Sequence, residues 1–239
     1  MPVLTTKAIV LSALKFGDTS LIVKCFTEKE GVKSYLIRGI LKSKKGKLKP
    51  AYFQPLTQLL LTANHNNKGT LNSIKEVQVL FPYETIPTSI VKQSIVLFLS
   101  EVLASIIKEE EENNALYNYI EAGLIWLDTH NSTSNFHLLF LLNLSYFLGF
   151  YPDIDENAFQ FNLLEGNEIG GPADKLLISG EKLYNFKKLL GINFDTIHSV
   201  SFSKKERQIV LQLIIRYFEL HLDGFREPKS LQVLETVFT

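Results

Sequence analysis

The spacing of apolar residues changes once along this chain of 239 residues, near Phe81-Pro82-Tyr83-Glu84. Before that point, short runs rich in Val, Ile, Leu and Tyr alternate with polar residues, as in half-buried β-strands. After it, apolar residues recur every three or four positions, as on one face of an α-helix. The change predicts an α+β multidomain chain, with a β-domain over residues 1–81 and an all-helical domain over residues 82–239.

Turn signals divide the first domain into five expected strands, at Thr6–Leu14, Leu21–Thr27, Val32–Leu41, Phe53–Thr62 and Leu71–Phe81. The segments between them are too short for crossover helices, so neighbouring strands must be antiparallel. We therefore expect a five-stranded antiparallel barrel of the OB-fold type, an architecture that often binds oligonucleotides.

Helices are expected over residues 88–108, 114–127, 134–150, 180–190, 203–222 and 229–238. Ser203 followed by Glu206 has the spacing of a capping box. The acidic run Glu109–Glu112 is expected to mark the end of the first helix, because negative charge there opposes the helix dipole. The apolar stretch Phe136–Phe150 is too short and too interrupted to span a membrane, so it is expected to be a buried core helix.

The formal net charge of zero conceals a strong asymmetry. Residues 1–80 carry thirteen Lys and Arg side chains against four Asp and Glu, whereas residues 81–239 carry twelve against twenty-one. A basic first third indicates a module that faces a polyanion, unless the clustering is only a chance feature of the surface.

Five lysines fall within eight residues in the segment Lys42–Lys49. Lysines on a loop between strands can neutralise nucleic-acid phosphates without sequence preference. The alternative is a solvated hairpin tip, or a sheet edge that lysines protect from aggregation. The residues expected to bind DNA are Lys15, Lys33, Arg38, Lys42, Lys44, Lys45, Lys47 and Lys49. Three aromatic residues of the same domain are either stacking faces for unpaired bases or barrel core: Tyr35, Tyr52 and Phe53.

No pattern of catalytic, cofactor-binding or metal-binding residues is found. The five histidines lack metal-ligand spacing, and neither a phosphate-binding glycine loop nor a nucleophile elbow is present. The single cysteine, Cys25, lies in an apolar strand and is expected to be a buried structural thiol. We therefore expect no enzyme, no cofactor and no metal. The sparse cysteine content and the absence of a signal-peptide pattern at the N-terminus favour a reducing cytoplasm.

Several motifs resemble the RecO family of bacterial recombination mediators. They are Phe16-Gly17-Asp18-Thr19-Ser20 with Phe26-Thr27 and Gly31-Val32-Lys33-Ser34, Arg38-Gly39-Ile40 before the lysine-rich loop, Phe53-Gln54-Pro55-Leu56-Thr57, Gly149-Phe150-Tyr151-Pro152 after a leucine-rich helix, and Arg216-Tyr217-Phe218 with His221-Leu222 and Lys229-Ser230-Leu231 near the end. The resemblance covers essentially the whole chain, in the family's order.

The resemblance implies an N-terminal OB-fold and a helical C-terminal domain. It also implies a role in DNA repair and recombination: binding of single- and double-stranded DNA, annealing of complementary strands and, with RecR, help for RecA to replace single-strand-binding protein. Such a protein would be cytoplasmic and associated with the nucleoid during repair. The helical domain would dock the acidic C-terminal tail of single-strand-binding protein, and the nearest cationic candidates are Lys204, Lys205, Arg207 and Arg216.

The chain departs from the family pattern in one segment. Many members carry zinc-binding cysteines after the Leu-Gly-x-x-Pro motif, whereas residues 153–172 contain none. We expect this insert to be irregular, to lack zinc and to be held by the packing of Ile154, Phe159, Phe161 and Leu163. Two other functions remain open: a non-enzymatic protein–protein adaptor whose barrel binds an acidic partner, and an RNA-binding OB-fold protein.

Overall fold

The computed structural model describes residues 3–42, 47–65, 71–131, 133–168 and 176–238. It divides into two compact units, residues 1–129 and residues 130–239. The first unit contains β1 (Val3–Phe16), β2 (Ser20–Thr27), β3 (Gly31–Ile37), η1 (Pro50–Phe53), β4 (Gln58–Asn64), β5 (Ser73–Val79), η2 (Ile86–Thr88), α1 (Ile90–Ile106) and α2 (Asn114–Thr129). The second contains α3 (Phe136–Phe147), β6 (Gln160–Asn162), β7 (Leu177–Ser179), α4 (Gly180–Lys187), η3 (Phe194–Ser199), α5 (Lys204–His221) and α6 (Leu231–Val237).

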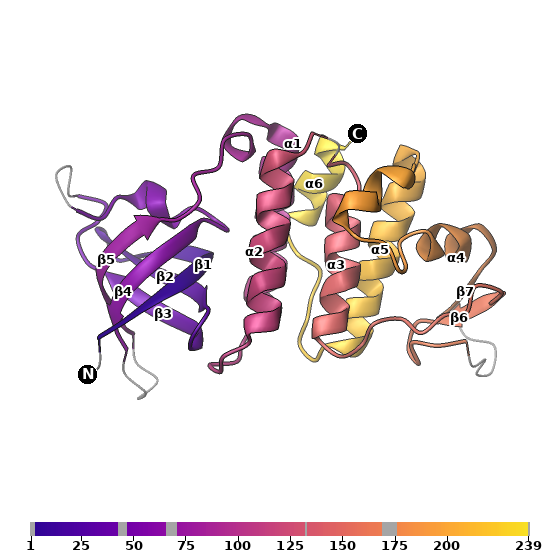
Figure 1. Ribbon diagram of the computed structural model, residues 1–239, viewed down its shortest axis with the longest axis horizontal. Coiled ribbons are helices and arrows are strands. Elements are labelled where there is room, and N and C mark those ends of the chain that lie inside the picture. The colour runs from indigo at the N-terminus through magenta and orange to yellow at the C-terminus, as the bar shows by residue number, and fades with distance from the viewer. Residues whose placement is uncertain (1–2, 43–46, 66–70, 132, 169–175, 239) are drawn as a thin grey trace. The chain divides into compact units, whose positions relative to one another are not determined.

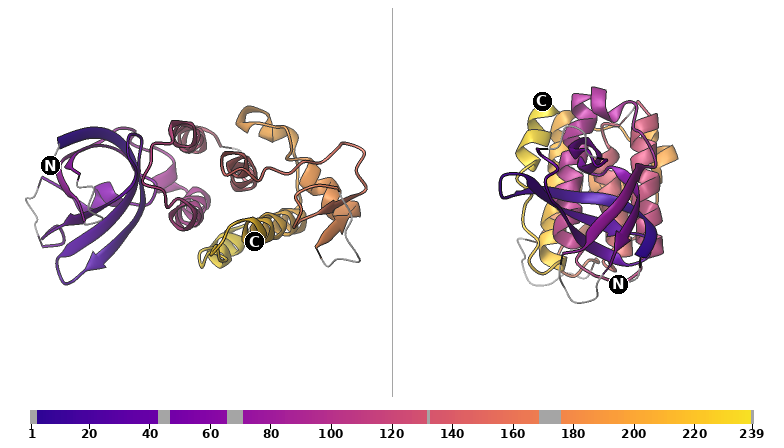
Figure 2. Two further views of the ribbon diagram at one scale, coloured as in Figure 1. Left: turned by 90° about the horizontal axis from the view of Figure 1, so that it is seen from below. Right: turned by 90° about the vertical axis from the view of Figure 1, so that its left-hand side faces the viewer.

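The first five strands form one antiparallel sheet in the order β3-β2-β1-β4-β5 (Figure 1). β1 is long enough to pair with β4 through its first half, from Val3 to Ile9, and with β2 from Ala8 to its end at Phe16. A register shift between Val10 and Ser12 marks a bulge in β1. Bulges bend a strand and increase its twist, which allows the sheet to curve around its own core, as Figure 2 shows.

The curved sheet is not closed into a complete barrel. Its edge strands, β3 and β5, share no ladder in the described part of the chain, and one parallel bridge joins Tyr35 to Asn72. There the backbone N–H of Asn72 donates to the Ser34 carbonyl (2.8 Å), and the backbone N–H of Leu36 donates to the Asn72 backbone carbonyl (3.0 Å). The expected five-stranded antiparallel OB-type sheet is therefore confirmed, but its edges meet at one point where a full barrel was expected.

Each face of the sheet has its own apolar partners. The inner face carries a buried cluster that includes Val23, Cys25, Tyr35 and Leu61. The outer face packs against α1 and α2, where the Phe26 and Tyr117 rings lie 5.6 Å apart. The Lys24 ammonium donates to the carbonyls of Ala104 (2.8 Å) and Ile107 (3.2 Å) at the end of α1. A cation there satisfies carbonyls that the helix itself leaves without donors.

A buried carboxylate holds the connection between the sheet and the helices. The Asp128 side chain accepts hydrogen bonds from the backbone N–H groups of Glu84 (2.9 Å), Thr85 (2.9 Å) and Ile86 (2.8 Å). Burial alone would raise the pKa of Asp128, but these amides outweigh it and hold the pKa below its usual range. The end of α2 is thereby tied to the segment that precedes α1.

The second unit is built around α3 and α5, which lie side by side (Figure 1). Phe136 of α3 stacks on Phe194 of η3, with ring centroids 5.1 Å apart. The predicted capping box of α5 is confirmed, because Ser203 and Glu206 exchange side-chain and backbone hydrogen bonds. In the described part of the chain, no helix has the length and apolar character needed to cross a membrane.

Four local expectations require correction. The third strand ends at Ile37, because the chain turns at Gly39 (φ +70°). Residues 50–57 form η1 and a loop instead of the start of a strand. The helix expected over residues 88–108 is shorter at both ends, since α1 runs from Ile90 to Ile106, although the acidic run Glu109–Glu112 does lie just beyond its end as expected. The insert at residues 153–172, expected to be irregular, contains β6, in which Phe161 pairs with Ile178 of β7, a strand that follows the insert.

Candidate nucleic-acid interface

The predicted basic loop connects β3 to η1. Lys42, Lys47 and Lys49 are exposed, whereas Lys44 and Lys45 lie outside the described residues. The loop begins with a turn in which the Lys42 N–H donates to the Gly39 carbonyl (3.2 Å). It ends where the Tyr52 N–H donates to the Lys49 carbonyl (3.0 Å), at the start of η1. Both ends of the loop are therefore held by backbone hydrogen bonds, and its described lysines face solvent.

Strand pairing brings two further predicted cations to the same end of the sheet. Lys15 lies next to the β1–β2 turn, and Arg38 directly follows β3. The Leu41 N–H donates to the Thr19 carbonyl (2.9 Å), and the Gly39 N–H donates to the Ser20 hydroxyl (3.4 Å). These bonds tie the segment after β3 to the β1–β2 turn. Lys15, Arg38 and Lys42, all exposed, therefore form one basic end of the sheet together with Lys47 and Lys49 on the same loop.

Lys33 differs from the other predicted DNA-binding cations. Its side chain is only 7% exposed, and its ammonium lies 3.0 Å from the carboxylate of Glu110. The backbone holds the same two segments together, because the Val32 N–H donates to the Glu109 carbonyl (2.9 Å). Lys33 already has an anionic partner within the fold. We therefore exclude it from the candidate interface.

The aromatic residues considered for base stacking belong mainly to the core. Tyr35 and Phe53 are buried in the inner cluster, and Tyr52 is half-buried against it. The Tyr35 hydroxyl lies 2.8 Å from Nε2 of His65, whose Nδ1 in turn lies 2.5 Å from a Glu30 carboxylate oxygen. Burial, followed by the charges of Cys25 and Glu30, raises the pKa of Tyr35. Tyr35 and Phe53 are therefore structural, as the core alternative predicted.

The four cations proposed for partner binding do not form one site. Lys204 and Lys205 are exposed in the first turn of α5. Arg207 turns inward, where its guanidinium donates to the Asn135 side-chain oxygen (3.0 Å) and to the Phe202 carbonyl (3.1 Å). Arg216 is exposed further along α5 and pairs with Glu219 at 2.9 Å. Arg207 is therefore part of the packing of its own unit.

A surface cavity of about 550 Å³ surrounds Arg216. Its walls come from α4, α5 and α6, and include Lys182, Ile209, Gln212, Leu213, Arg216 and Glu235. Sequence reasoning missed Lys182, because helical periodicity cannot show that α4 and α5 bring Lys182 and Arg216 to one cavity. Two cations together with the apolar side chains of Ile209 and Leu213 can hold a peptide that carries carboxylates and an aromatic side chain, although Glu235 in the same lining repels carboxylates.

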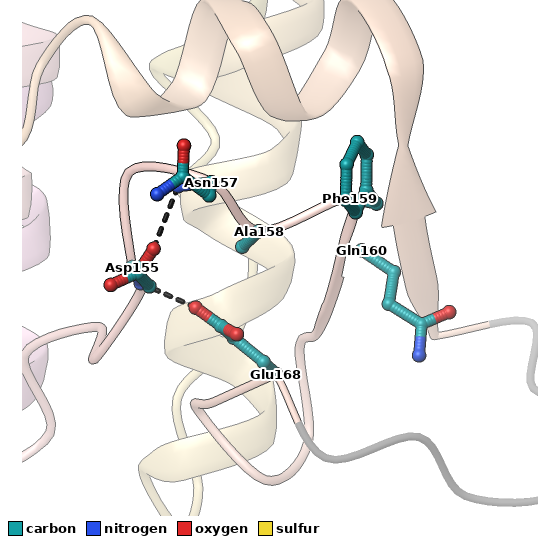
Figure 3. Close-up of a pocket in the computed structure, with 6 residues that line it drawn as sticks. All are labelled: Asp155, Asn157, Ala158, Phe159, Gln160 and Glu168. Atoms are coloured by element: carbon teal, nitrogen blue, oxygen red, sulfur yellow. Dashed lines mark hydrogen bonds between the residues drawn. The ribbon is translucent and has the colours of Figure 1, made fainter.

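The cysteine-free insert forms a smaller hollow of about 410 Å³ (Figure 3). The Glu168 carboxylate accepts a hydrogen bond from the Asp155 N–H, and the Asp155 carboxylate accepts one from the Asn157 N–H (2.7 Å). Phe161 and Leu163 are buried as expected, but Phe159 is 89% exposed and does not hold the insert together. Among the described residues, no group of three His, Cys, Asp or Glu side chains is arranged to hold a metal.

Cys25 is fully buried, and burial raises the pKa of its thiol, which disfavours the reactive thiolate. The chemically distinctive surface of the first unit is therefore the basic end of the sheet. Exposed cations there can neutralise phosphates, and no reacting group has to be placed beside them.

Comparison with known proteins gives a consistent result for both parts of the chain. The family model described as "Recombination protein O N terminal" matches residues 1–83, and "Recombination protein O C terminal" matches residues 87–232. Similar proteins include those named DNA repair protein RecO from Flavobacterium psychrophilum (47% identical), Flavobacterium johnsoniae (45%) and Bacteroides fragilis (37%). Each alignment covers 98% of this chain and 98% of the relative.

Proposed function

This chain belongs to the RecO family of DNA repair proteins, and from that premise we propose that it acts as a recombination mediator without catalytic turnover. It binds single- and double-stranded DNA and anneals complementary strands. With RecR, it helps RecA load onto DNA that single-strand-binding protein has coated. This role places the protein in the cytoplasm, at the nucleoid during repair.

The observation that carries the DNA-binding proposal is the basic end of the OB-type sheet. Lys15, Arg38, Lys42, Lys47 and Lys49 are exposed there. Lys44 and Lys45, outside the described residues, belong to the same loop and are included in the proposal. Each phosphate that a lysine neutralises releases counterions, which provides affinity without reading the base sequence.

Annealing follows from the same arrangement. Two complementary strands repel each other through their phosphates, and flexible lysines lower that repulsion when both strands are bound. Because these cations contact phosphates, the base edges stay free to pair. A surface that recognised base edges would have to release them before a duplex could form.

The direct test is the salt dependence of binding to a labelled single-stranded oligonucleotide, measured by fluorescence anisotropy. The variant Lys42→Ala/Lys47→Ala/Lys49→Ala removes three cations of the loop. The control variant Lys182→Ala/Lys204→Ala/Lys205→Ala removes the same charge from the second unit, called the helical unit below. The slope of log K against log salt is negative, and each lost contact with a single strand makes it less steep by about 0.7. We expect the slope of the loop variant to be less steep than that of the wild type by roughly two units, and the slope of the control variant to equal that of the wild type.

Unchanged slope in the loop variant would remove the loop from the interface. Negligible binding by the wild-type protein at low salt would favour the adaptor function. Tighter binding to RNA than to DNA in competition would favour the RNA-binding function.

The contact with the acidic tail of single-strand-binding protein is proposed for the cavity around Arg216. Lys182 and Arg216 supply positive charge and Leu213 supplies apolar surface. A peptide that ends in acidic residues and an aromatic side chain should bind the wild-type protein, and Arg216→Ala should weaken binding more than Lys205→Ala, since Lys205 does not line the cavity. Equal loss in the two variants would contradict this location.

A further inference from the structure

An exposed apolar strip crosses the outer face of the sheet beside the basic end. Strand register places Leu14, Ile22 and Leu36 in one row across β1, β2 and β3. Phe16 lies two residues beyond Leu14 in the same strand, so its side chain is on the same face. Leu14 is 65% exposed and Phe16 is 53% exposed, while Ile22 and Leu36 are half-buried. The strip therefore ends at an exposed aromatic ring, that of Phe16.

Exposed cations lie on the segment that is hydrogen-bonded to the end of this strip. Phe16 pairs with Ser20, whose hydroxyl accepts a hydrogen bond from the Gly39 N–H (3.4 Å). Arg38 precedes this glycine and is exposed, and Lys42 follows on the same tied segment. The acidic residue of the β1–β2 turn is Asp18, which is also exposed. The local balance is positive, so the surface around Phe16 suits an anionic ligand with flat apolar parts.

Unpaired nucleic acid is the ligand with that chemistry. In OB-folds, oligonucleotides bind to the face of strands 2 and 3 and to the loop between strands 1 and 2, which is where this strip lies. Bases stack on exposed aromatic rings whatever their sequence, while nearby cations follow the backbone. The buried rings of Tyr35 and Phe53 cannot take this role.

We propose that Phe16 is the stacking residue of the interface: it receives an unpaired base, while Arg38 and Lys42 contact the adjacent phosphates. The inference rests on the proposed function and adds a specific consequence. Single strands gain both stacking and phosphate contacts, whereas the bases of a duplex are already stacked on one another and gain phosphate contacts alone. Phe16 therefore favours single-stranded over double-stranded DNA.

The test compares three probes with the full-length protein: a thymidine oligonucleotide of about 16 nucleotides, an abasic strand of equal length and a duplex of equal length. Phe16→Ala should weaken binding of the thymidine strand by about fivefold or more, and should change binding of the other two probes little. Its salt slope should match the wild type, because no cation is lost. Phe159→Ala removes an even more exposed phenylalanine from the helical unit and should change none of these affinities.

Two further variants separate stacking from simple apolar contact. Phe16→Leu keeps an apolar side chain without a ring and should behave like Phe16→Ala. Phe16→Trp should retain affinity, and its fluorescence should be quenched by the thymidine strand but not by the abasic strand.

Failure of the stacking role and failure of the proposed function would give different results. Full affinity in Phe16→Leu, or equal losses for the thymidine and abasic strands, would overturn the stacking role. An unchanged Phe16→Ala in a protein with a steep salt slope would reject the inference and leave the proposed function standing. Negligible binding of all three probes by the wild type would reject the proposed function itself.

Discussion

Single residues of one chemical type serve opposite purposes in this protein. Lys42 is exposed on a loop, whereas Lys33 is buried and paired with Glu110. Arg216 lines a cavity, whereas Arg207 bonds to Asn135 within the packing of its own unit. Side-chain identity therefore shows which charges are present, but the neighbours of each charge decide whether a ligand can reach it.

His137 gives a prediction at this scale. It is fully buried in α3, and burial, followed by the charge of Arg207, lowers its pKa to about 3. Above pH 6.5 the ring is neutral in both the folded and the unfolded state, so it adds no pH dependence. As the pH falls below 6.5, only the unfolded state takes up the proton. The free energy of unfolding should therefore fall by about 2 kcal/mol between pH 7 and pH 5 because of this residue.

Urea unfolding of wild type and His137→Leu across this range measures the effect. The variant should show a shallower fall in the free energy of unfolding, whatever its stability at pH 7. His198→Leu, which replaces an exposed histidine, should retain the wild-type slope. Parallel curves for wild type and His137→Leu would contradict the prediction.

At the scale of elements, the acidic run after α1 packs against the β2–β3 turn. Gly31 in that turn has φ +60°, and a Cβ atom on it would overlap the carbonyl oxygens of Glu109 and Glu111. Two requirements therefore meet at Gly31: a left-handed backbone and close approach of a second segment. Gly17, in the β1–β2 turn, meets only the first, since its φ is +58° and its surroundings are open.

This pair of glycines allows a matched comparison. Gly17→Ala should cost about 1 kcal/mol, the penalty for an L-residue in the left-handed region. Gly31→Ala should cost a further 1–3 kcal/mol or so, because the Glu109–Glu111 backbone must also move. Urea unfolding of both variants measures the difference, and equal losses would show that the acidic segment does not press on the turn.

At the scale of the whole molecule, the first compact unit extends beyond the sheet. The N-terminal family model ends at residue 83, but the unit extends to residue 129 and includes α1 and α2. The helices cover the part of the outer face that includes Phe26, and the Lys7 ammonium donates to the Glu121 carboxylate of α2 at 3.2 Å. The boundary expected at residues 81 and 82 is the position where strands give way to helices. The first compact unit ends later, at residue 129, because α1 and α2 pack on the sheet.

The fragment comprising residues 1–129 should therefore unfold cooperatively, whereas residues 1–83 should not. The shorter fragment would expose Ile9 and Phe26, which are almost completely buried in the full chain. Thermal unfolding followed by circular dichroism, with a dye that binds exposed apolar surface, distinguishes the two fragments. Equal cooperativity in both would mean that the sheet is stable without its helices.

The five strands of the first sheet, the main helices and the family could be predicted from the amino-acid sequence alone. Two-residue alternation, three-to-four-residue spacing and the Ser203–Glu206 cap act over a few residues, so they could be interpreted without knowing the fold. The spacing located the strands and helices to within a few residues, and motifs in the right order indicated the RecO family. The β6–β7 hairpin was missed, because each of its strands has three residues and offers no periodicity to detect.

Which side chains are accessible to a ligand could be seen only once the chain was folded. Lys33, expected at the DNA interface, is buried and paired with Glu110, a residue 77 positions away, and Lys182 of α4 lines the same cavity as Arg216 of α5. Phe16 and Phe159 are exposed although aromatic residues favour burial, and Tyr35 is buried although it could have stacked on a base. The physical reason is that local patterns act through backbone periodicity, whereas burial, pairing and exposure depend on segments that pack together from distant parts of the chain.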